Sequence, residues 1–201
     1  METIDDPRQR WEQWLSFPNG PLAYGVTMLV YRMSVYRQFM EICENAPRDV
    51  IESGAAYVHW VRSIYADAQL SGIRRQAKGG SNVISLRRLF TEMHDNTDDQ
   101  EQRTRIADDR AELIRTTKLA VARTTTAIAH LHDRNSPTYT DEARESEHIT
   151  YEELHDCVDT IARLYSDYTE LLFDARPFLE SFPTMPLWDY AFRFPWIVDD
   201  K

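Results

Sequence analysis

The chain has 201 residues and a mass of 23.6 kDa, long enough to bury a core as one domain. All six glycines lie within the first 80 positions and no proline occurs from position 48 to 136. This pattern excludes a β-sandwich or barrel, which needs turn residues every ~8–12 positions. The net charge of −10 argues against a broadly basic nucleic-acid-coating surface but leaves room for a local basic site. The mean hydropathy is −0.55, and no apolar run approaches the ~18–20 residues of a membrane span.

The N-terminal part of the sequence predicts three helices joined by short turns. A short helix over 7–17 carries Trp11 and Trp14 on one face, which we expect to anchor it to the core. Longer helices follow over 22–45 and 50–71, each with apolar residues at three- to four-residue spacing. Because long helices joined by short turns pack as antiparallel neighbours, we expect a helix bundle.

The middle of the sequence predicts a loop and two further helices. The loop spans 72–83 and contains three of the six glycines. Ser85 then caps a short helix that ends near position 94. The longest helical stretch begins at Thr97 or Asp98 and continues to about position 133, with acidic residues in its first turn that suit the helix dipole.

The C-terminal part combines a capped helix with an aromatic segment. After an acidic loop over 135–149, Thr150 and Glu153 form a capping box for a helix that ends near position 175. The remaining residues contain four prolines and seven aromatic side chains, which predicts an irregular strap packed across the bundle. We therefore expect one all-α domain of five to six helices over 1–201, with an N-terminal helix and turn over 1–20, the bundle over 22–175 and the strap over 176–201.

The two cysteines, Cys43 and Cys157, do not make a disulfide framework, and we expect both in the core. The N-terminus shows no charged-then-apolar leader. These observations predict a reduced, cytoplasmic protein that does not associate with a membrane.

Metal motifs are weak in this sequence. Glu145-x-x-His148 and Glu152-x-x-His155 have the spacing found in di-iron bundles, but both lie within eleven residues instead of on separate helices. We therefore expect no metal and no cofactor, and a ferritin-like metalloprotein is a distant alternative.

The pattern with the clearest chemistry joins Arg123 and His130 on one predicted helix. Seven residues correspond to about 700° of rotation, so both side chains project from one face, about 10 Å apart along the axis. Histidine transfers protons near neutral pH and arginine binds phosphate, a combination suited to metal-free phosphodiester cleavage. Thr126 and Ala127 lie between them, and such small residues would let a second copy of the chain approach about a two-fold axis.

A basic stretch lies between Asp67 and Glu92, where no acidic residue occurs. Its members are Arg74, Arg75, Lys78, Arg87 and Arg88. One interpretation is a rim that contacts RNA phosphates. The alternative is a solvated loop whose charges serve solubility and pair with the acidic segment 141–153.

Several stretches, taken in their order, resemble the HEPN-like helical proteins, and within them the abortive-infection U family. They are YRQF at 36–39, IYADAQLSGIRRQ at 64–76, SLRRLF at 85–90, AIAHLHD at 127–133, ITYEEL at 149–154 and FRFPWI at 192–197. The resemblance covers about residues 31–196. It rests on the order and spacing of these stretches more than on any single one.

The resemblance implies an all-helical, HEPN-like antiparallel bundle that forms a homodimer. It also implies a metal-independent RNA endonuclease that acts as a toxin or abortive-infection effector, with an antitoxin as a partner. In catalytic members the Arg and His of an Arg-x(4 to 6)-His motif form the site, and they map here to Arg123 and His130. Thr124 stands where active members usually place Asn, Asp or His. The alternative function is a non-catalytic HEPN-like dimerisation or binding module.

Overall fold

The computed structural model describes residues 6–80, 82–125, 148–177 and 179, and these residues form helices without any strand. The helices are α1 (Pro7–Leu15), α2 (Pro21–Asn45), α3 (Arg48–Ala77), α4 (Leu86–Asn96), α5 (Gln100–Arg123) and α7 (Tyr151–Phe173). The all-α class predicted from the sequence is therefore confirmed. The continuation of the longest helix to position 133, the loop that follows it and most of the C-terminal strap lie outside the described residues.

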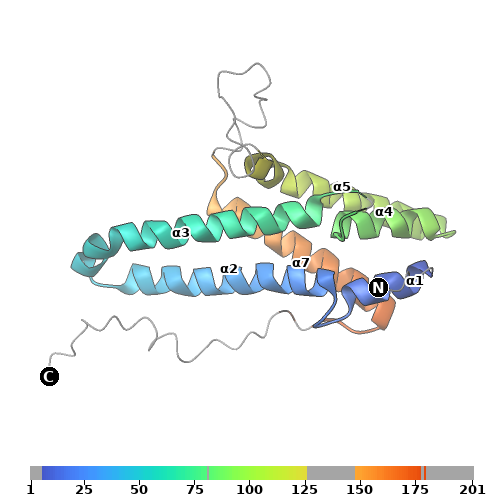
Figure 1. The fold of residues 1–201 in the computed structure, drawn as a ribbon, viewed down its shortest axis with the longest axis horizontal. Helices are drawn as coiled ribbons and strands as arrows, with labels where there is room; N and C mark the ends of the chain where they lie inside the picture. The colour runs from blue at the N-terminus through green and yellow to red at the C-terminus, as the bar shows by residue number, and fades with distance from the viewer. Residues whose placement is uncertain (1–5, 81, 126–147, 178, 180–201) are drawn as a thin grey trace, which may run out of the picture.

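The two longest helices, α2 and α3, form an antiparallel hairpin that defines the long axis of the molecule (Figure 1). Ala46 and Pro47 make the turn between them, and Pro47 precedes the first residue of α3. A proline at this place stops α2, since it restricts the residue before it and cannot donate a helical hydrogen bond.

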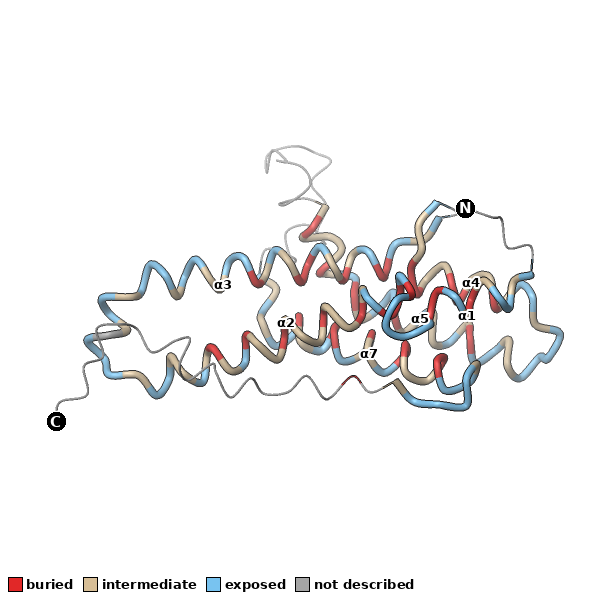
Figure 2. Tube along the Cα trace, turned by 60° about the horizontal axis from the view of Figure 1, so that its bottom comes forward, coloured by how far each residue is buried: buried red, intermediate tan, exposed pale blue. Residues whose placement is uncertain are grey.

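The remaining helices pack around one half of this hairpin and bury it (Figures 1 and 2). Buried residues gather where α1, α4, α5 and α7 meet that half, whereas the half of the hairpin near its turn is largely exposed (Figure 2). The fully buried large side chains include Phe90, Ile106, Leu113, Tyr165 and Tyr168. The core therefore lies at one end of the hairpin.

The predicted starts of α1, α4 and α7 agree with the structure, and those of α2, α3 and α5 shift by one to three residues. Ser85 accepts a hydrogen bond from the backbone N–H of Arg88, and Thr150 forms a reciprocal capping box with Glu153. The N-cap of α5 is Asp99, one or two residues after the predicted start. Each cap satisfies backbone N–H groups that a helix leaves without partners at its start.

The predicted loop over 72–83 is wrong in its first six residues, because α3 continues through Gly72 to Ala77. A Cβ at Gly72 would lie 2.6 Å from Cδ2 of the buried Leu29, so this glycine lets α2 and α3 approach closely. Gly72 is therefore a packing residue inside the helix, and Arg74 and Arg75 belong to the last turn of α3.

The tryptophans of α1 anchor this helix to the core, as predicted. Trp11 and Trp14 are buried, and the carbonyl of Leu15 accepts a hydrogen bond of 3.0 Å from the hydroxyl of Tyr165. This contact ties the end of α1 to the centre of α7.

The turn between α1 and α2 provides a direct test of the packing. A Cβ at Gly20 would lie 2.5 Å from the carbonyl oxygen of Trp14 and 2.7 Å from that of Gln13. Because backbone atoms would have to move, we expect Gly20→Ala to lower the free energy of unfolding by about 2 kcal/mol in urea titrations. As a control, Gly54→Ala adds a Cβ with nothing within 4 Å inside a helix. It should raise stability by about 0.5–1 kcal/mol, and a similar loss for both variants would contradict this packing.

Candidate nucleic-acid interface

The C-terminal end of α3 presents three basic residues. Arg74 and Arg75 lie in the last turn of the helix, and Lys78 is its C-cap. Arg74 is half-buried, whereas Arg75 and Lys78 are exposed. Positive side chains at this end also suit the negative end of the helix dipole. The helix ends where Gly79 and Gly80 follow, and Gly80 adopts a φ of +133° that other residues rarely adopt.

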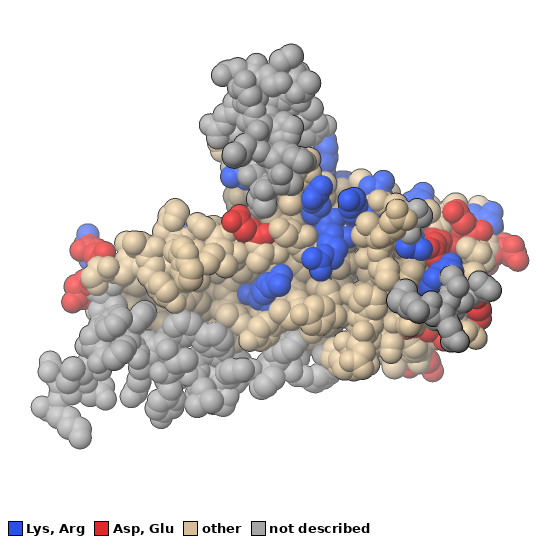
Figure 3. Space-filling view, in the orientation of Figure 1, with Lys and Arg blue, Asp and Glu red and all other residues tan. Residues whose placement is uncertain are grey.

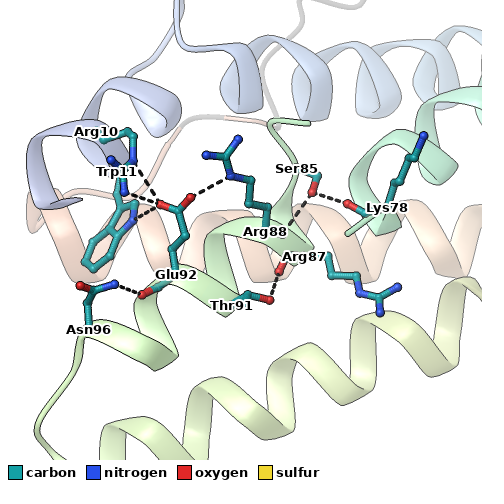
Figure 4. Close-up of polar contacts among 9 residues, drawn as sticks. All are labelled: Arg10, Trp11, Lys78, Ser85, Arg87, Arg88, Thr91, Glu92 and Asn96. Atoms are coloured by element: carbon teal, nitrogen blue, oxygen red, sulfur yellow. Dashed lines mark hydrogen bonds and ion pairs between the residues drawn. The ribbon is translucent and has the colours of Figure 1, made fainter. Parts of the chain in front are cut away.

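A buried serine joins this end of α3 to the start of α4. The Ser85 hydroxyl donates a hydrogen bond of 2.6 Å to the carbonyl of Lys78 and accepts one of 3.1 Å from the N–H of Arg88 (Figure 4). Ser85 is fully buried. One side chain therefore holds the two helix ends together. It fixes the position of the basic residues of α3 relative to those of α4.

Arg87 extends from the first turn of α4 back toward the end of α3. Its guanidinium lies 3.4 Å from the carbonyl of Ala77, and a Cβ at Gly79 would meet its Nε at 3.1 Å. Arg87 thus packs over Gly79, where a larger residue would crowd its guanidinium. Together, Arg74, Arg75, Lys78 and Arg87 form what we call the basic surface.

Arg88, predicted to belong with these residues, points to the other side of α4 (Figure 4). Its Nε donates a 2.8 Å hydrogen bond to Glu92, and its guanidinium lies over the ring of Trp14 at 4.7 Å. Glu92 also accepts hydrogen bonds from Arg10 and from the indole N–H of Trp11. These five residues, which we call the Glu92 cluster, fasten α1 to α4. The structure does not bring Arg88 to the basic surface.

The end of α5 lies against α3, close to the basic surface. The buried Thr124 hydroxyl donates to the carbonyl of Leu70 at 3.1 Å and lies 2.7 Å from that of Ala120. Leu70 precedes Arg74 by one helical turn, about 5.4 Å along α3. Arg123, in the last turn of α5 and half-buried, therefore lies beside the helix end that carries Arg74. Its predicted catalytic partner His130, like Thr126 and Ala127, lies outside the described residues.

Lysine and arginine side chains gather in this region of the surface. Figure 3 shows them near the end of α3, whereas acidic side chains are prominent at the two ends of the molecule. A protein with a net charge of −10 thus has a local positive area where the sequence lacks acidic residues between Asp67 and Glu92. Arginine forks bind phosphate oxygens in a bidentate manner, so this area can hold the backbone of a nucleic acid.

A second group of chemistry-bearing residues escaped the sequence analysis. Tyr36, Tyr65 and Tyr151, from α2, α3 and α7, stack with ring centroids 3.9 Å and 5.2 Å from that of Tyr36. The guanidinium of Arg62 lies 4.8 Å above the ring of Tyr151, and the ring of His155 packs edge-on against Tyr36 and Tyr65. No local sequence pattern marks this cluster, because its members come from three helices.

Burial governs the protonation of this tyrosine cluster. It raises the pKa of Tyr65 to about 12 and lowers the pKa of His155 below its ordinary value, with Arg37 adding to the second effect. The Nε2 atom of His155 is buried without a hydrogen-bond partner among the described residues. The cluster therefore holds a neutral histidine among apolar rings, which suits a packing role between three helices.

The described residues contain no group of three or more His, Cys, Asp or Glu side chains that could hold a metal ion. Cys157 is buried as predicted, donates to the carbonyl of Thr116, and burial raises the pKa of its thiol to about 12. A thiol that stays protonated is a poor nucleophile. Cys43, predicted to be a core residue as well, is only half-buried.

None of the helices within the described ranges is long and apolar enough to cross a membrane. In comparisons with known proteins, no family model, no curated protein and no solved structure matches the chain.

Proposed function

We propose that this protein binds RNA on its basic surface and cleaves it without a metal ion, as a toxin or abortive-infection effector that works as a homodimer in the cytoplasm. One observation carries the proposal. The Thr124–Leu70 contact brings the end of α5, with Arg123, to the end of α3 that carries Arg74, Arg75 and Lys78. This neighbourhood of helix ends supports a proposed phosphate clamp, Arg123, acting beside proposed phosphate contacts that lie 45 to 49 positions earlier in the sequence.

The chemistry follows from the two residue types. In the homodimer, one His130 takes the proton of the RNA 2′-OH as a general base, and the protonated His130 of the second copy donates a proton to the leaving 5′-oxygen as the acid. The 2′-oxygen attacks the adjacent phosphorus, the bond to the 5′-oxygen breaks, and a cyclic phosphate and a 5′-OH result. Arg123 holds the phosphate and its developing negative charge. DNA lacks the 2′-OH and is not cut, and a chelator leaves the activity intact.

RNA binding can be tested apart from cleavage. We expect the double variant Arg75→Ala/Lys78→Ala to bind single-stranded RNA roughly 10-fold more weakly at low salt, because two phosphate contacts are lost. The slope of log K against log salt should fall by about 1.4, at ~0.7 per contact. Fluorescence anisotropy with a labelled oligonucleotide measures both quantities.

Arg48→Ala is the matched control for this experiment. Arg48 begins α3 at the opposite end, its side chain is 92% exposed, and its only role in the described contacts is an ion pair with Glu52. It should leave both the affinity and the salt slope unchanged. Because Arg48→Ala removes one charge and the double variant two, a loss for Arg48→Ala of about half that of the double variant would show that binding follows overall charge instead of the basic surface.

The surroundings of Thr124 favour a second candidate function, a non-catalytic binding or dimerisation module. The Thr124 hydroxyl is buried and engaged with carbonyls of α3 and α5, so it is not available to a substrate. In that case the protein would bind RNA or a partner chain through the same helix ends without cutting. RNA that is bound but stays intact, in the presence of a cellular extract that supplies any trigger, would decide for this function.

A further inference from the structure

An open groove of about 770 Å³ runs between α2 and α7, away from the basic surface. From α2 it is lined by Val30, Met33, Ser34, Arg37, Gln38 and Glu41, a stripe with three- to four-residue spacing. This stripe extends over eleven residues, or about 17 Å along the helix. Arg37 pairs across the groove with Asp159 of α7 at 3.7 Å.

The chain itself enters this groove at one end. After α7, Asp174 adopts a left-handed conformation with a φ of 51°, which ends the helix. Pro177 and Leu179 then line the groove together with Val30, and Leu179 is only 7% exposed as part of the core. The backbone N–H of Leu179 donates to the carbonyl of Pro177 at 3.0 Å. Leu179, the last described residue, therefore lies inside the groove.

We propose that residues 180–186 of the chain occupy this groove, with Phe182 and Met185 as the side chains that fill it. A polyproline II chain has three residues per turn and rises about 3.1 Å per residue, so Phe182 and Met185 share a face and five to six residues cover the 17 Å of the α2 stripe. Pro183 and Pro186 favour an extended conformation and need no donor partner. The proposal is independent of the RNA-cleaving function.

The chemistry of the groove matches this occupant. Val30, Met33, Ala162 and Leu179 supply apolar surface. The remaining lining is largely charged, with Arg37, Glu41, Asp159, Arg163, Asp167 and Arg176. Phenylalanine and methionine side chains bury well against such apolar surface. A tethered segment also has an effective concentration in the millimolar range, so it outcompetes a free peptide or a second copy of similar affinity.

Photo-crosslinking in the full chain tests the proposal. Gln38 lies eight residues, or about 12 Å, beyond Val30 on the groove wall. We would replace it by p-benzoyl-phenylalanine, irradiate the protein and identify the crosslinked peptide by mass spectrometry. The expected result is a crosslink to residues 180–186 of the same chain. A crosslink to a second chain, to another segment, or the absence of any crosslink would overturn the proposal.

A substitution in the segment gives a second readout that does not depend on the crosslinker. Phe182→Asp should lower the Tm by roughly 4 °C and abolish the crosslink from position 38, since a charged group replaces the side chain that fills the groove. Tyr24→Asp is the control, because Tyr24 is an exposed aromatic residue of α2 at 60% exposure. It should change the Tm by less than 1 °C. Equal Tm values for Phe182→Asp and the unsubstituted protein would overturn the proposal.

Discussion

His130→Ala should reduce RNA cleavage by about 10²- to 10⁴-fold, the range attributed to general acid–base catalysis. The loss should appear in kcat at saturating RNA, because the imidazole transfers protons in the transition state and does not contribute to substrate binding. Single-turnover cleavage of a labelled RNA measures it, with far-UV circular dichroism to verify unchanged helicity. Cleavage at the unsubstituted rate would remove His130 from the site.

Arg123→Lys is the companion to this experiment. It keeps the positive charge but replaces the planar fork of donors by a point charge, so cleavage should also fail. RNA affinity should change far less, since the basic surface, to which Arg123 does not belong, is intact. A lysine variant that cuts as fast as the original would show that charge alone suffices and that Arg123 is not a phosphate clamp.

Glu92→Ala should lower the free energy of unfolding by about 3 kcal/mol at pH 7, the largest stability loss we expect. The side chain is only 18% exposed and accepts hydrogen bonds from Arg10, Trp11 and Arg88, so its removal leaves two guanidinium groups of α1 and α4 without their acceptor. Urea unfolding followed by circular dichroism measures the loss. Glu12→Ala is the control, because it removes an exposed ion pair with Arg8 and should cost less than 0.5 kcal/mol.

The same variant has a defined pH dependence. Burial by itself would raise the pKa of Glu92, but hydrogen bonds from Arg88, Arg10 and Trp11 outweigh it and lower the pKa below its ordinary 4.5. Its contribution to stability is therefore complete above pH 4.5 and is lost as the pH falls through the lowered pKa. The stability difference between the original protein and Glu92→Ala should shrink below pH 4.5. A difference that stays constant down to pH 3 would contradict this assignment.

Helix existence and helix starts could be predicted from the sequence because their causes are local. Ser85 and Thr150 precede amphipathic runs, and each hydroxyl accepts a hydrogen bond from the N–H three residues further on. The all-α class followed from the absence of turn residues over most of the chain. None of these inferences required knowledge of residues distant in the sequence.

Tertiary packing decided the features that the sequence analysis missed. Gly72 was expected to end α3, yet its missing side chain makes room for Leu29 of another helix. Ile64 belongs to the apolar pattern that predicted the helix over 50–71, yet it is 48% exposed, and among the described residues only α2 and α3 line the surface around it. A periodic pattern shows which face is apolar and cannot show whether a neighbour reaches it.

In the candidate site, too, the sequence indicated which residue types are present, and tertiary contacts determined where they lie. The basic residues were recognisable as a group in the sequence. Only the structure separates Arg88, which is held by Glu92 and Trp14, from the four residues of the basic surface. Where α5 approaches that end, a hydrogen bond joins Thr124 to Leu70, which are 54 positions apart. No spacing rule reveals such a contact.

The uneven burial of the α2–α3 hairpin gives the molecule two regions of different thermodynamic character. Near its turn the two helices are supported mainly by each other, with Tyr57 and Trp60 at 41% and 57% exposure, whereas their other halves are covered by the rest of the bundle. Local opening costs less free energy where fewer apolar contacts are broken. Amide hydrogens near Asn45 and Arg48 will therefore exchange through fraying of the hairpin tip, while those near Leu22 and Ile73 exchange only when the whole core unfolds.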